Sequence, residues 1–140
     1  MSTSKNKANV RRHVEEVWNK GNLDIIPELI SPKYVAHPLT GDEVKGTDGF
    51  KQLVTTMRTA VPDLHITIDS MVAEGDTVAA RYTYTGTFTG EIPGYKPTGK
   101  KFKWTDALFH RFEGGKQVEA WTFADSLVRS RQLGIPIPAE

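Results

Sequence analysis

The sequence contains no cysteine among its 140 residues. This absence excludes structural disulfides and thiolate sites, and it leaves the redox compartment open. A surplus of charge of one sign is also missing, because 18 lysines and arginines face 17 acidic residues and the net charge is +1. The sequence therefore offers no electrostatic case for binding nucleic acid or an anionic membrane, and it has no RNA-binding or zinc motif.

Long apolar runs are absent as well. No segment approaches the roughly 20 apolar residues of a membrane-spanning helix. The first residues, MSTSKNKANV, lack the apolar stretch of a signal peptide. We therefore expect a soluble, cytoplasmic protein. The length suits one hydrophobic core, so we expect a single domain over residues 1–140, with an ordered part of about 8–134.

The first part of the chain has helical periodicity, and the second part alternates like strands. The spacing predicts helices over about 6–20, over LDIIPELI (23–30) and between GTDG and VPD, with a brief extended segment at KYVAHPL (33–39). After residue 63, β-branched and aromatic residues alternate between Gly-containing turns, which predicts strands at about 64–73, 77–89, 99–112 and 117–125. Helices followed by strands indicate an α+β fold, with the helices over one face of an antiparallel sheet.

The segment FHRFEGGKQVEAWTFAD (109–125) reads as a hairpin that carries ionisable groups among aromatic residues. A two-residue turn at Gly114 and Gly115 predicts four cross-strand pairs on one face: His110 with Glu119, Leu108 with Trp121, Asp106 with Phe123, and Trp104 with Asp125. The opposite face would carry smaller or apolar residues, namely Thr105, Ala107, Phe109, Val118, Ala120 and Thr122. An aromatic wall with a few convergent polar groups is typical of a ligand pocket.

Two alternatives stay open for this hairpin. A three-residue turn or a bulge would move the side chains of one strand to the other face. In the predicted register, His110 and Glu119 equally fit a plain ion pair near the turn. Arg81 lies in the middle of a predicted strand, and it fits a place in the pocket or on the outer face equally well.

The succession YVAHPL, VPDLHITIDSMVAEGDTVAARYTYTGTFTG, PTGKKFKWTDALFHRFEGGKQVEAW and DSLVRSRQLG resembles the SnoaL-like polyketide cyclase family, also known as ester cyclases. The likeness covers roughly residues 8–134. It implies a cone-shaped α+β barrel, in which a curved antiparallel sheet wraps around helices and encloses a deep cavity, as in ketosteroid isomerase and limonene epoxide hydrolase. It also implies a homodimer, the common state in this group.

The resemblance also implies roles for single residues. In the cyclases, an aspartate on the last strand is the acid/base of an intramolecular aldol closure, and Asp125 matches its position best. His110 is the nearest match to the histidine of the preceding strand. His37 lies where ketosteroid isomerase has its catalytic aspartate, and Leu108 falls near that enzyme's second aspartate, which disfavours steroid isomerisation.

These residue types suit proton removal next to a carbonyl, because a carboxylate among Trp104, Trp121 and Phe123 would have its pKa raised by desolvation. We therefore expect an enzyme that needs no cofactor and no metal and acts on a hydrophobic carbonyl compound, with Asp125, His110 and His37 as catalytic residues. The substrate-binding residues would be Trp104, Asp106, Leu108, Glu119, Trp121, Phe123 and Arg81. A non-catalytic small-molecule-binding protein of the same fold, or an epoxide hydrolase-like enzyme, are the alternatives.

Overall fold

The computed structural model describes residues 2–38, 42–92 and 95–136. Leu39 of the predicted extended segment and the predicted loose end from residue 137 onward lie outside the described residues. The elements follow in this order: α1 (Thr3–Arg12), the π-helix η1 (His13–Asn19), the 3-10 helix η2 (Leu23–Ile25), α2 (Ile26–Leu29), β1 (Ile30–His37), β2 (Val44–Lys45), α3 (Gly46–Ala60), β3 (His65–Glu74), β4 (Thr77–Thr87), β5 (Lys101–Glu113), β6 (Lys116–Phe123) and α4 (Ser126–Leu133).

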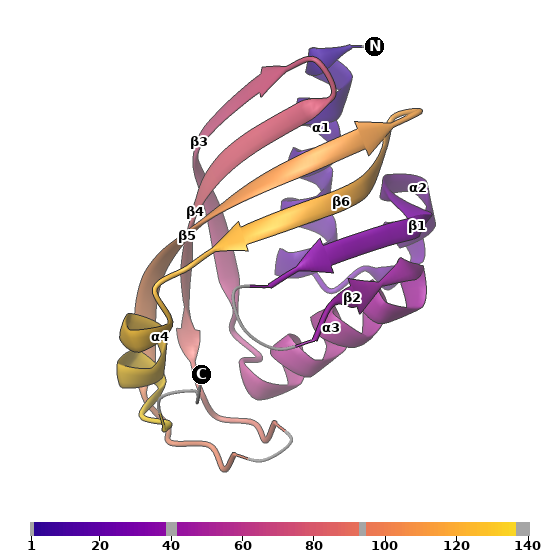
Figure 1. Ribbon diagram of the computed structural model, residues 1–140. Coiled ribbons are helices and arrows are strands. Elements are labelled where there is room, and N and C mark those ends of the chain that lie inside the picture. The colour runs from indigo at the N-terminus through magenta and orange to yellow at the C-terminus, as the bar shows by residue number, and fades with distance from the viewer. Residues whose placement is uncertain (1, 39–41, 93–94, 137–140) are drawn as a thin grey trace.

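The six strands form one curved sheet in the order β2-β1-β6-β5-β4-β3. Figure 1 shows this sheet with α1 behind it and α3 beside β1 and β2. The sheet does not close, since β2 and β3 are its two edges. The predicted α+β class with a curved sheet around N-terminal helices is confirmed, as an open cone rather than a closed barrel.

One strand pair departs from the predicted antiparallel sheet. β1 runs parallel to β6, with Ala36 opposite Ala120 and His37 opposite Trp121. A parallel neighbour needs a long crossover connection, and the chain supplies it with α3 and the whole β3–β5 meander between these two strands. The prediction of an all-antiparallel sheet is therefore wrong for this pair.

The first predicted helix changes its winding halfway along. α1 begins earlier than expected, because the side chain of Ser2 accepts a hydrogen bond from the backbone N–H of Lys5 at 3.2 Å and caps the helix. From His13 to Asn19 the helix continues as a π-helix. π-Helical segments are rare in proteins, and those that occur are often found at functional sites.

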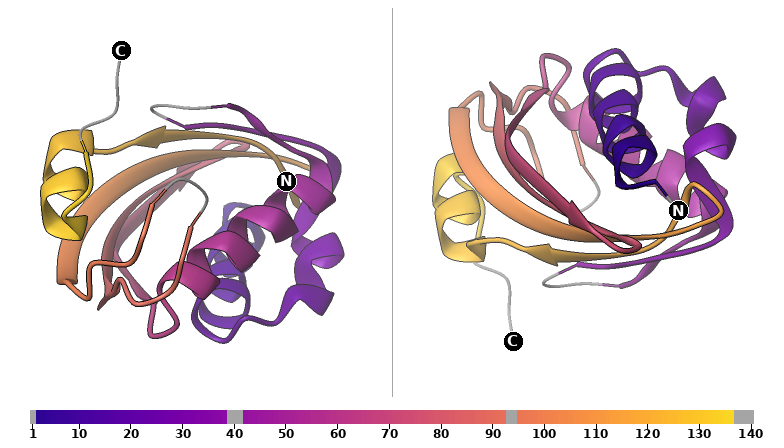
Figure 2. Two further views of the ribbon diagram at one scale, coloured as in Figure 1. Left: turned by 90° about the horizontal axis from the view of Figure 1, so that it is seen from below. Right: turned by 90° about the horizontal axis from the view of Figure 1, so that it is seen from above.

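Helices and sheet bury the core between them. Val10, Val14 and Val17 of the first helix are at most 3% exposed, which matches the predicted periodicity. Figure 2 shows the sheet curving around these helices, with α4 at the far end of the sheet from α1 and α3. α4 and the short strand β2 were not predicted from the sequence. In the parts of the chain described above, no helix combines the length and apolar character that crossing a bilayer takes.

Candidate functional site

Strand β5 turns one row of side chains inward, toward the helices. Trp104, Asp106 and His110 on this row are at most 6% exposed, and Leu108 between them faces a small internal pocket. The predicted common face for these four residues of β5 is confirmed. We call this space the inner pocket. Its volume is about 70 Å³, and it is lined by His13, Val14, Trp18, Tyr34, Ala36, Phe50, Leu53, Ile66, Tyr82, Tyr84, Leu108, His110 and Thr122.

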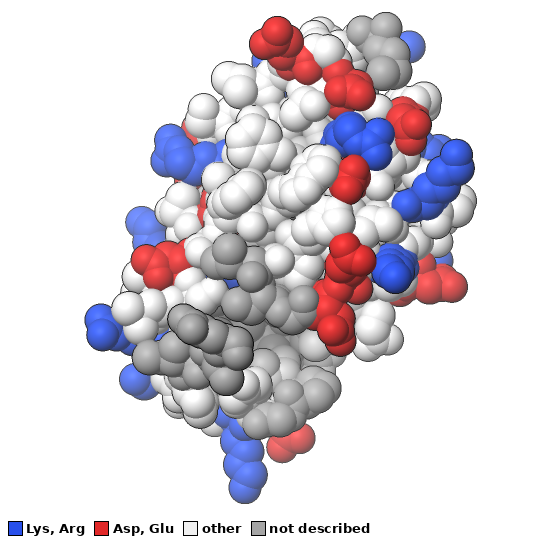
Figure 3. All heavy atoms as spheres, in the orientation of Figure 1, with Lys and Arg blue, Asp and Glu red and all other residues white. Residues whose placement is uncertain are grey.

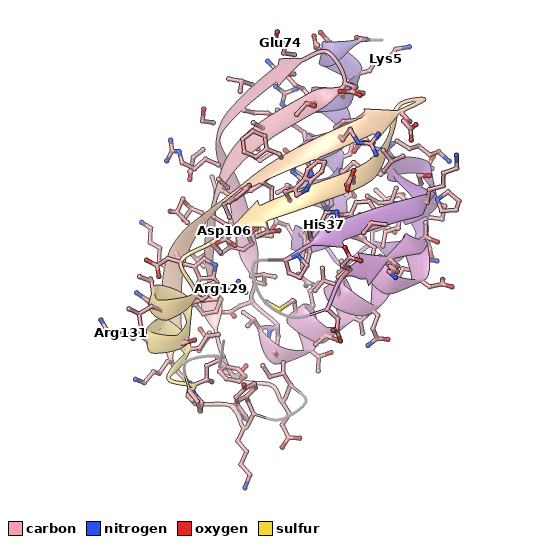
Figure 4. All side chains as sticks on the ribbon, viewed as in Figure 1. Lys5, His37, Glu74, Asp106, Arg129 and Arg131 are labelled. Carbon is pink, nitrogen blue, oxygen red and sulfur yellow. The ribbon has the colours of Figure 1, made fainter. Side chains whose placement is uncertain are left out.

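Asp106 has no hydrogen-bond partner for one of its buried carboxyl oxygens, Oδ1. The indole N–H of Trp104, two residues away on the same face, is also buried without a partner. Burial raises the pKa of Asp106 to about 6, although the positive charge of Arg129 acts in the opposite direction. Figure 4 shows Asp106 on β5 and Arg129 on the neighbouring helix α4. Asp106 does not itself line the inner pocket but lies two residues from Leu108, which does. A buried carboxylate whose pKa lies near neutrality is suited to accept a proton.

His110 lies at the other end of the same row and is held by two side chains. Its Nε2 is 2.7 Å from the hydroxyl oxygen of Tyr82, and its Nδ1 is 3.0 Å from Oε1 of Gln117. Burial lowers the pKa of His110 to about 4. The imidazole is therefore neutral at neutral pH and is fixed in orientation by its two partners.

Gln117 connects His110 to the first helix. Its Nε2 is 3.0 Å from Oδ1 of Asn9 and 3.1 Å from Nδ1 of His13. Nε2 of His13 is 2.9 Å from the indole nitrogen of Trp18. Burial, and secondly the neighbouring His110, lower the pKa of His13 to about 3. A buried polar network thus runs from Tyr82 to Trp18 along the wall of the inner pocket.

The predicted register of the hairpin is wrong beyond its first two pairs. Gly114 and Gly115 do form the two-residue turn with positive φ, and Glu113 pairs with Lys116 as predicted. The register then shifts between Phe112 and Arg111, so Glu119 lies opposite Arg111 and not opposite His110. This bulge allows Gln117 and Val118, which are consecutive, both to be buried.

The bulge moves three predicted pocket residues to the outer face of the sheet. Trp121 lies opposite Phe109, and Phe123 lies opposite Ala107, both on the outer row of β5. Glu119 is also on this face. In their place, Ala120 and Thr122 point inward, and Thr122 lines the inner pocket. The predicted assignment of Ala120 and Thr122 to the outer face is wrong for the same reason, whereas Val118 is the unpaired residue of the bulge.

Asp125 is not beside Trp104 in the structure. It lies after the end of β6, is exposed, and caps α4 by accepting a hydrogen bond from the backbone N–H of Val128 at 3.0 Å. Trp104, Trp121 and Asp125 therefore share no pocket, which removes the geometric case for Asp125 as the base. Its catalytic role stays a prediction from the family resemblance alone.

Arg81 belongs to the outer face. It pairs with Ala107, its side chain is 58% exposed, and its nearest carboxylate is that of Asp69 at 3.8 Å. Of the two alternatives for this residue, the position in the pocket is excluded.

His37 lies outside the inner pocket, in a charged cluster on the outer face. Its Nε2 and Nδ1 are each 2.7 Å from a carboxylate oxygen, of Glu119 and Glu43 respectively. Arg111 donates two hydrogen bonds to the other oxygen of Glu119, at 3.0 and 3.2 Å. The ring of His37 stacks on Trp121 with 5.6 Å between centroids. The hydrogen bond to Glu119 is the largest of the effects that raise the pKa of His37.

The cluster makes a prediction for His37 that NMR titration can check. The pKa of His37 should lie above that of a free histidine, and Glu119→Gln should lower it by removing the main partner of the cation. Because the pKa is raised in the folded state, the contribution of His37 to stability is present below a pH of about 6.5 and is lost as the pH rises through its raised pKa. Glu113→Gln is the control, since Glu113 contacts Arg111 and not His37. An equal effect of both substitutions would contradict the assignment.

Several residues of the inner pocket and of the polar network beside it were not identified from the sequence. Gln117 gave no signal, because its inward position depends on the bulge. His13 and Trp18 lie five positions apart, a spacing that brings side chains together only in a π-helix. Tyr82 and Tyr84 of β4 also line the inner pocket. Among the residues that the structure describes, no three His, Asp or Glu side chains are grouped to hold a metal ion.

Comparisons with known proteins agree with this architecture. The sequence model of a family described as SnoaL-like polyketide cyclase matches residues 8–133. Aklanonic acid methyl ester cyclase DnrD of Streptomyces peucetius is 29% identical over 132 residues, which cover 92% of this chain and 90% of that protein.

Solved structures add two similar chains. A proposed SnoaL-like polyketide cyclase from Jannaschia sp. CCS1 superimposes with a TM-score of 0.86 at 22% identity, over 96% of this chain and 94% of that one. AclR of Streptomyces galilaeus, a proposed hydroxylase, has a TM-score of 0.81 at 32% identity, over 99% of this chain and 87% of that one.

Proposed function

Because the chain belongs to the SnoaL-like polyketide cyclase family, we propose that it is a cyclase acting on a hydrophobic, polyketide-like carbonyl compound. The reaction begins with removal of a proton next to a carbonyl group and needs no cofactor. The resulting enolate attacks a second carbonyl of the same molecule, which forms one carbon–carbon bond. The first proton then returns to the new alkoxide, so the product is an isomer of the substrate. DnrD, the cyclase similar to this chain, is named for a methyl ester substrate, which supports a polyketide ester as the substrate class.

The observation that carries this proposal is the state of Asp106. The residue is 6% exposed, one of its carboxyl oxygens has no partner, and burial raises its pKa to about 6. Leaving a buried carboxylate oxygen without a partner costs about 1–3 kcal/mol of stability, and more for a charged group. Groups perturbed in this way cluster at functional sites. We therefore assign the general base to Asp106 in place of the predicted Asp125.

Two neighbours of Asp106 can stabilise the negative charge that develops on the substrate. The indole N–H of Trp104 is buried without an acceptor, so it can donate a hydrogen bond to a carbonyl oxygen. Arg129 lies with its guanidinium 5.3 Å from the centre of the Trp104 ring and adds a positive charge. A donor, a base and a cation thus occupy one end of the inward row of β5.

The inner pocket is smaller than a polyketide. Its volume of about 70 Å³ falls well below the roughly 300–1,000 Å³ of pockets that hold drug-sized ligands. Side chains of the pocket must therefore move when a substrate enters. Phe50 and Leu53 of α3 are among the lining side chains whose displacement would enlarge the pocket.

Proton exchange at carbon tests the proposal directly. Aromatic polyketide and β-ketoester compounds would be screened by thermal shift, and each ligand would then be incubated with the protein in D₂O and followed by NMR. We expect the protein to accelerate deuterium incorporation at the carbon between the carbonyl groups. If tight ligands are found and none exchanges faster than in buffer, the protein is a small-molecule-binding member of the fold instead. AclR, a proposed hydroxylase, is also similar to this chain, so the activity must be tested directly, because a fold does not determine a function.

We also propose that the outer face of the sheet joins two copies of the chain. One cross-strand row on this face runs through five strands, from Val72 through Ala79, Phe109 and Trp121 to His37. Val72 is 64% exposed and Phe109 is 44% exposed, and in Figure 3 uncharged side chains cover the middle of this face. The helices cover the other face of the sheet, so a second copy is the partner best placed to bury this row.

Phe109→Glu should convert the dimer into a monomer. A charge in the centre of the row would be buried in the interface, which should raise the dissociation constant at least about a hundredfold. Light scattering coupled to gel filtration at micromolar concentration measures the effect. Gln52→Glu, which adds the same charge on the exposed side of α3, is the control and should leave the dimer intact. A wild-type monomer at this concentration would contradict the proposal.

A further inference from the structure

The positions of the hydrogen atoms in the buried polar network can be assigned by starting from Asn9. At one end, Nδ2 of Asn9 lies 3.0 Å from the backbone oxygen of Leu29 and 3.1 Å from that of Gly115. Carbonyl oxygens only accept hydrogen bonds, so the amide nitrogen of Asn9 must face them and its Oδ1 must face Gln117. The group of Gln117 that meets Oδ1 is therefore its NH₂, 3.0 Å away.

This orientation of Gln117 determines the tautomer of His110. The Oε1 of Gln117 faces Nδ1 of His110, which must carry the hydrogen. The bare Nε2 of His110 then accepts a hydrogen bond from the hydroxyl of Tyr82. Every group on this side of Gln117 is matched with a suitable partner.

The other side of Gln117 leads to a mismatch. Its second amide hydrogen points to Nδ1 of His13, which must then be bare to accept it. A neutral imidazole carries one hydrogen, so this hydrogen is on Nε2 of His13. Nε2 lies 2.9 Å from Nε1 of Trp18, which can only donate. Two N–H groups therefore face each other.

Neither the other tautomer of His13 nor a turn of either amide removes the mismatch. Moving the hydrogen of His13 to Nδ1 sets it against the NH₂ of Gln117. Turning the amide of Gln117 around sets its oxygen against Oδ1 of Asn9, and turning Asn9 as well sets its oxygen against two carbonyls. A second proton on His13 would only add a donor, and burial lowers the pKa of His13 to about 3 in any case.

The mismatch is relieved most easily where there is space. His13 and Trp18 both line the inner pocket, whereas Asn9 and Gln117 do not. The π-helix η1 begins at His13 and includes Trp18, so its wide turn is what sets the two side chains next to each other. Two N–H donors thus meet at the wall of the pocket and share no acceptor.

We propose that the N–H groups of Trp18 and of His13 Nε2 form a donor pair that binds an oxygen atom of the ligand, a carbonyl or enolate oxygen. This inference deepens the proposed function and rests on it for the class of ligand. Once the two rings turn so that both N–H groups point toward it, an oxygen at about 2.9 Å from both nitrogens can accept both hydrogen bonds at once. The pair lies beside His110. Asp106 precedes His110 by four residues on β5, which corresponds to roughly 13 Å along an extended strand. The substrate therefore carries a second oxygen function remote from the carbon that loses its proton.

The first test reads the tautomers and requires no ligand. Long-range ¹H–¹⁵N NMR spectra at neutral pH distinguish a bare ring nitrogen from a protonated one. We expect opposite tautomers, with the hydrogen on Nε2 in His13 and on Nδ1 in His110. A hydrogen on Nδ1 of His13 would overturn the donor pair.

The second test removes one donor. Trp18→Phe deletes the indole N–H and so relieves the mismatch. It also removes ring volume that packs against the core, so the thermal midpoint serves only to show that the variant is folded. 4-Nitrophenol serves as the enol mimic, and its absorbance reports its ionisation. We expect the wild type to bind the phenolate and to lower the pKa of the probe, and Trp18→Phe to bind the phenolate at least about tenfold more weakly.

Trp121→Phe is the matched control, because Trp121 stacks on His37 on the outer face. It should leave phenolate binding unchanged. Unchanged phenolate binding in a folded Trp18→Phe would overturn the pair, and so would a wild type that does not bind the phenolate.

Failure of the pair can be told apart from failure of the proposed function. If Trp18→Phe loses phenolate binding and the wild type catalyses no carbon exchange, the donor pair is supported and the cyclase activity is rejected. Carbon exchange that depends on Asp106, with phenolate binding independent of Trp18, would keep the cyclase and reject the pair.

Discussion

Asp106→Asn should lower the rate of carbon exchange, and of any cyclisation that follows it, by about 10²–10⁴-fold. Asparagine keeps the size of the side chain and one carbonyl oxygen, but it cannot take a proton from carbon. The base must be ionised to act, so kcat/KM of the wild type should rise with pH through about 6, the raised pKa of Asp106. The measurement is deuterium incorporation by NMR for wild type and variant across this range.

Asp125→Asn is the matched control for this result. Asparagine caps helices about as well as aspartate, so the hydrogen bond to Val128 and the fold should be retained. With its side chain exposed and away from the inner pocket, Asp125 should be replaceable with little loss of rate. A large loss in Asp125→Asn together with full activity in Asp106→Asn would reverse the assignment and restore the prediction from the family resemblance.

The same Asp106→Asn variant should be more stable than the wild type at neutral and alkaline pH. A rise of the pKa from 3.8 to about 6 on folding corresponds to about 3 kcal/mol of stability lost when the carboxylate is ionised. The sign follows from the raised pKa, because the folded state favours the protonated form. The wild type has no such loss below a pH of about 4, and it reaches the full loss above a pH of about 6. Urea unfolding at several pH values measures the difference between the two proteins.

Asp63 offers a control of opposite sign. Hydrogen bonds from Thr87, first that from its backbone N–H, lower the pKa of Asp63. Asp63→Asn should therefore destabilise the protein at neutral pH, and its effect should diminish as the pH falls through the lowered pKa. If Asp106→Asn destabilised the protein at neutral pH to the same extent as at pH 4, burial would not raise the pKa of Asp106.

Periodicity located most elements, since local spacing determines which residues can share a buried face. β3 was predicted at about 64–73 and is His65–Glu74, and α3 ends at Ala60, before the predicted stop at VPD. α4 was missed because its short sequence has little apolar periodicity, and Asp125, its N-cap, had been assigned to the preceding strand. β2 is too short for any local pattern, and only its pairing with β1 defines it.

The inward-facing residues of the candidate site were predicted correctly on β5 and incorrectly on β6. Alternation along β5 is local, so the inward row of Trp104, Asp106, Leu108 and His110 followed from the sequence. The facing side chains of β6 depend on the register, and a single bulge exchanged the two faces of that strand. The bulge is stabilised by the bonds of Gln117 to Asn9 and His13, which are more than 100 residues away in the sequence. No local pattern encodes such a contact.

The sequence by itself determined the class of fold, the family, the tight turn at Gly114 and Gly115, and the inward row of β5, because each of these depends on neighbours in the chain or on their order. Only the tertiary structure decided which carboxylate is buried without a partner, that His37 and Glu119 lie together on the outer face, and that His13 meets Trp18 at the pocket. Burial and hydrogen-bond matching depend on what covers a side chain. For His110 the cover includes His13, the first residue of helix η1, whose ring centre is 6.1 Å away, and the π-winding of η1 is recognised only when the chain is folded.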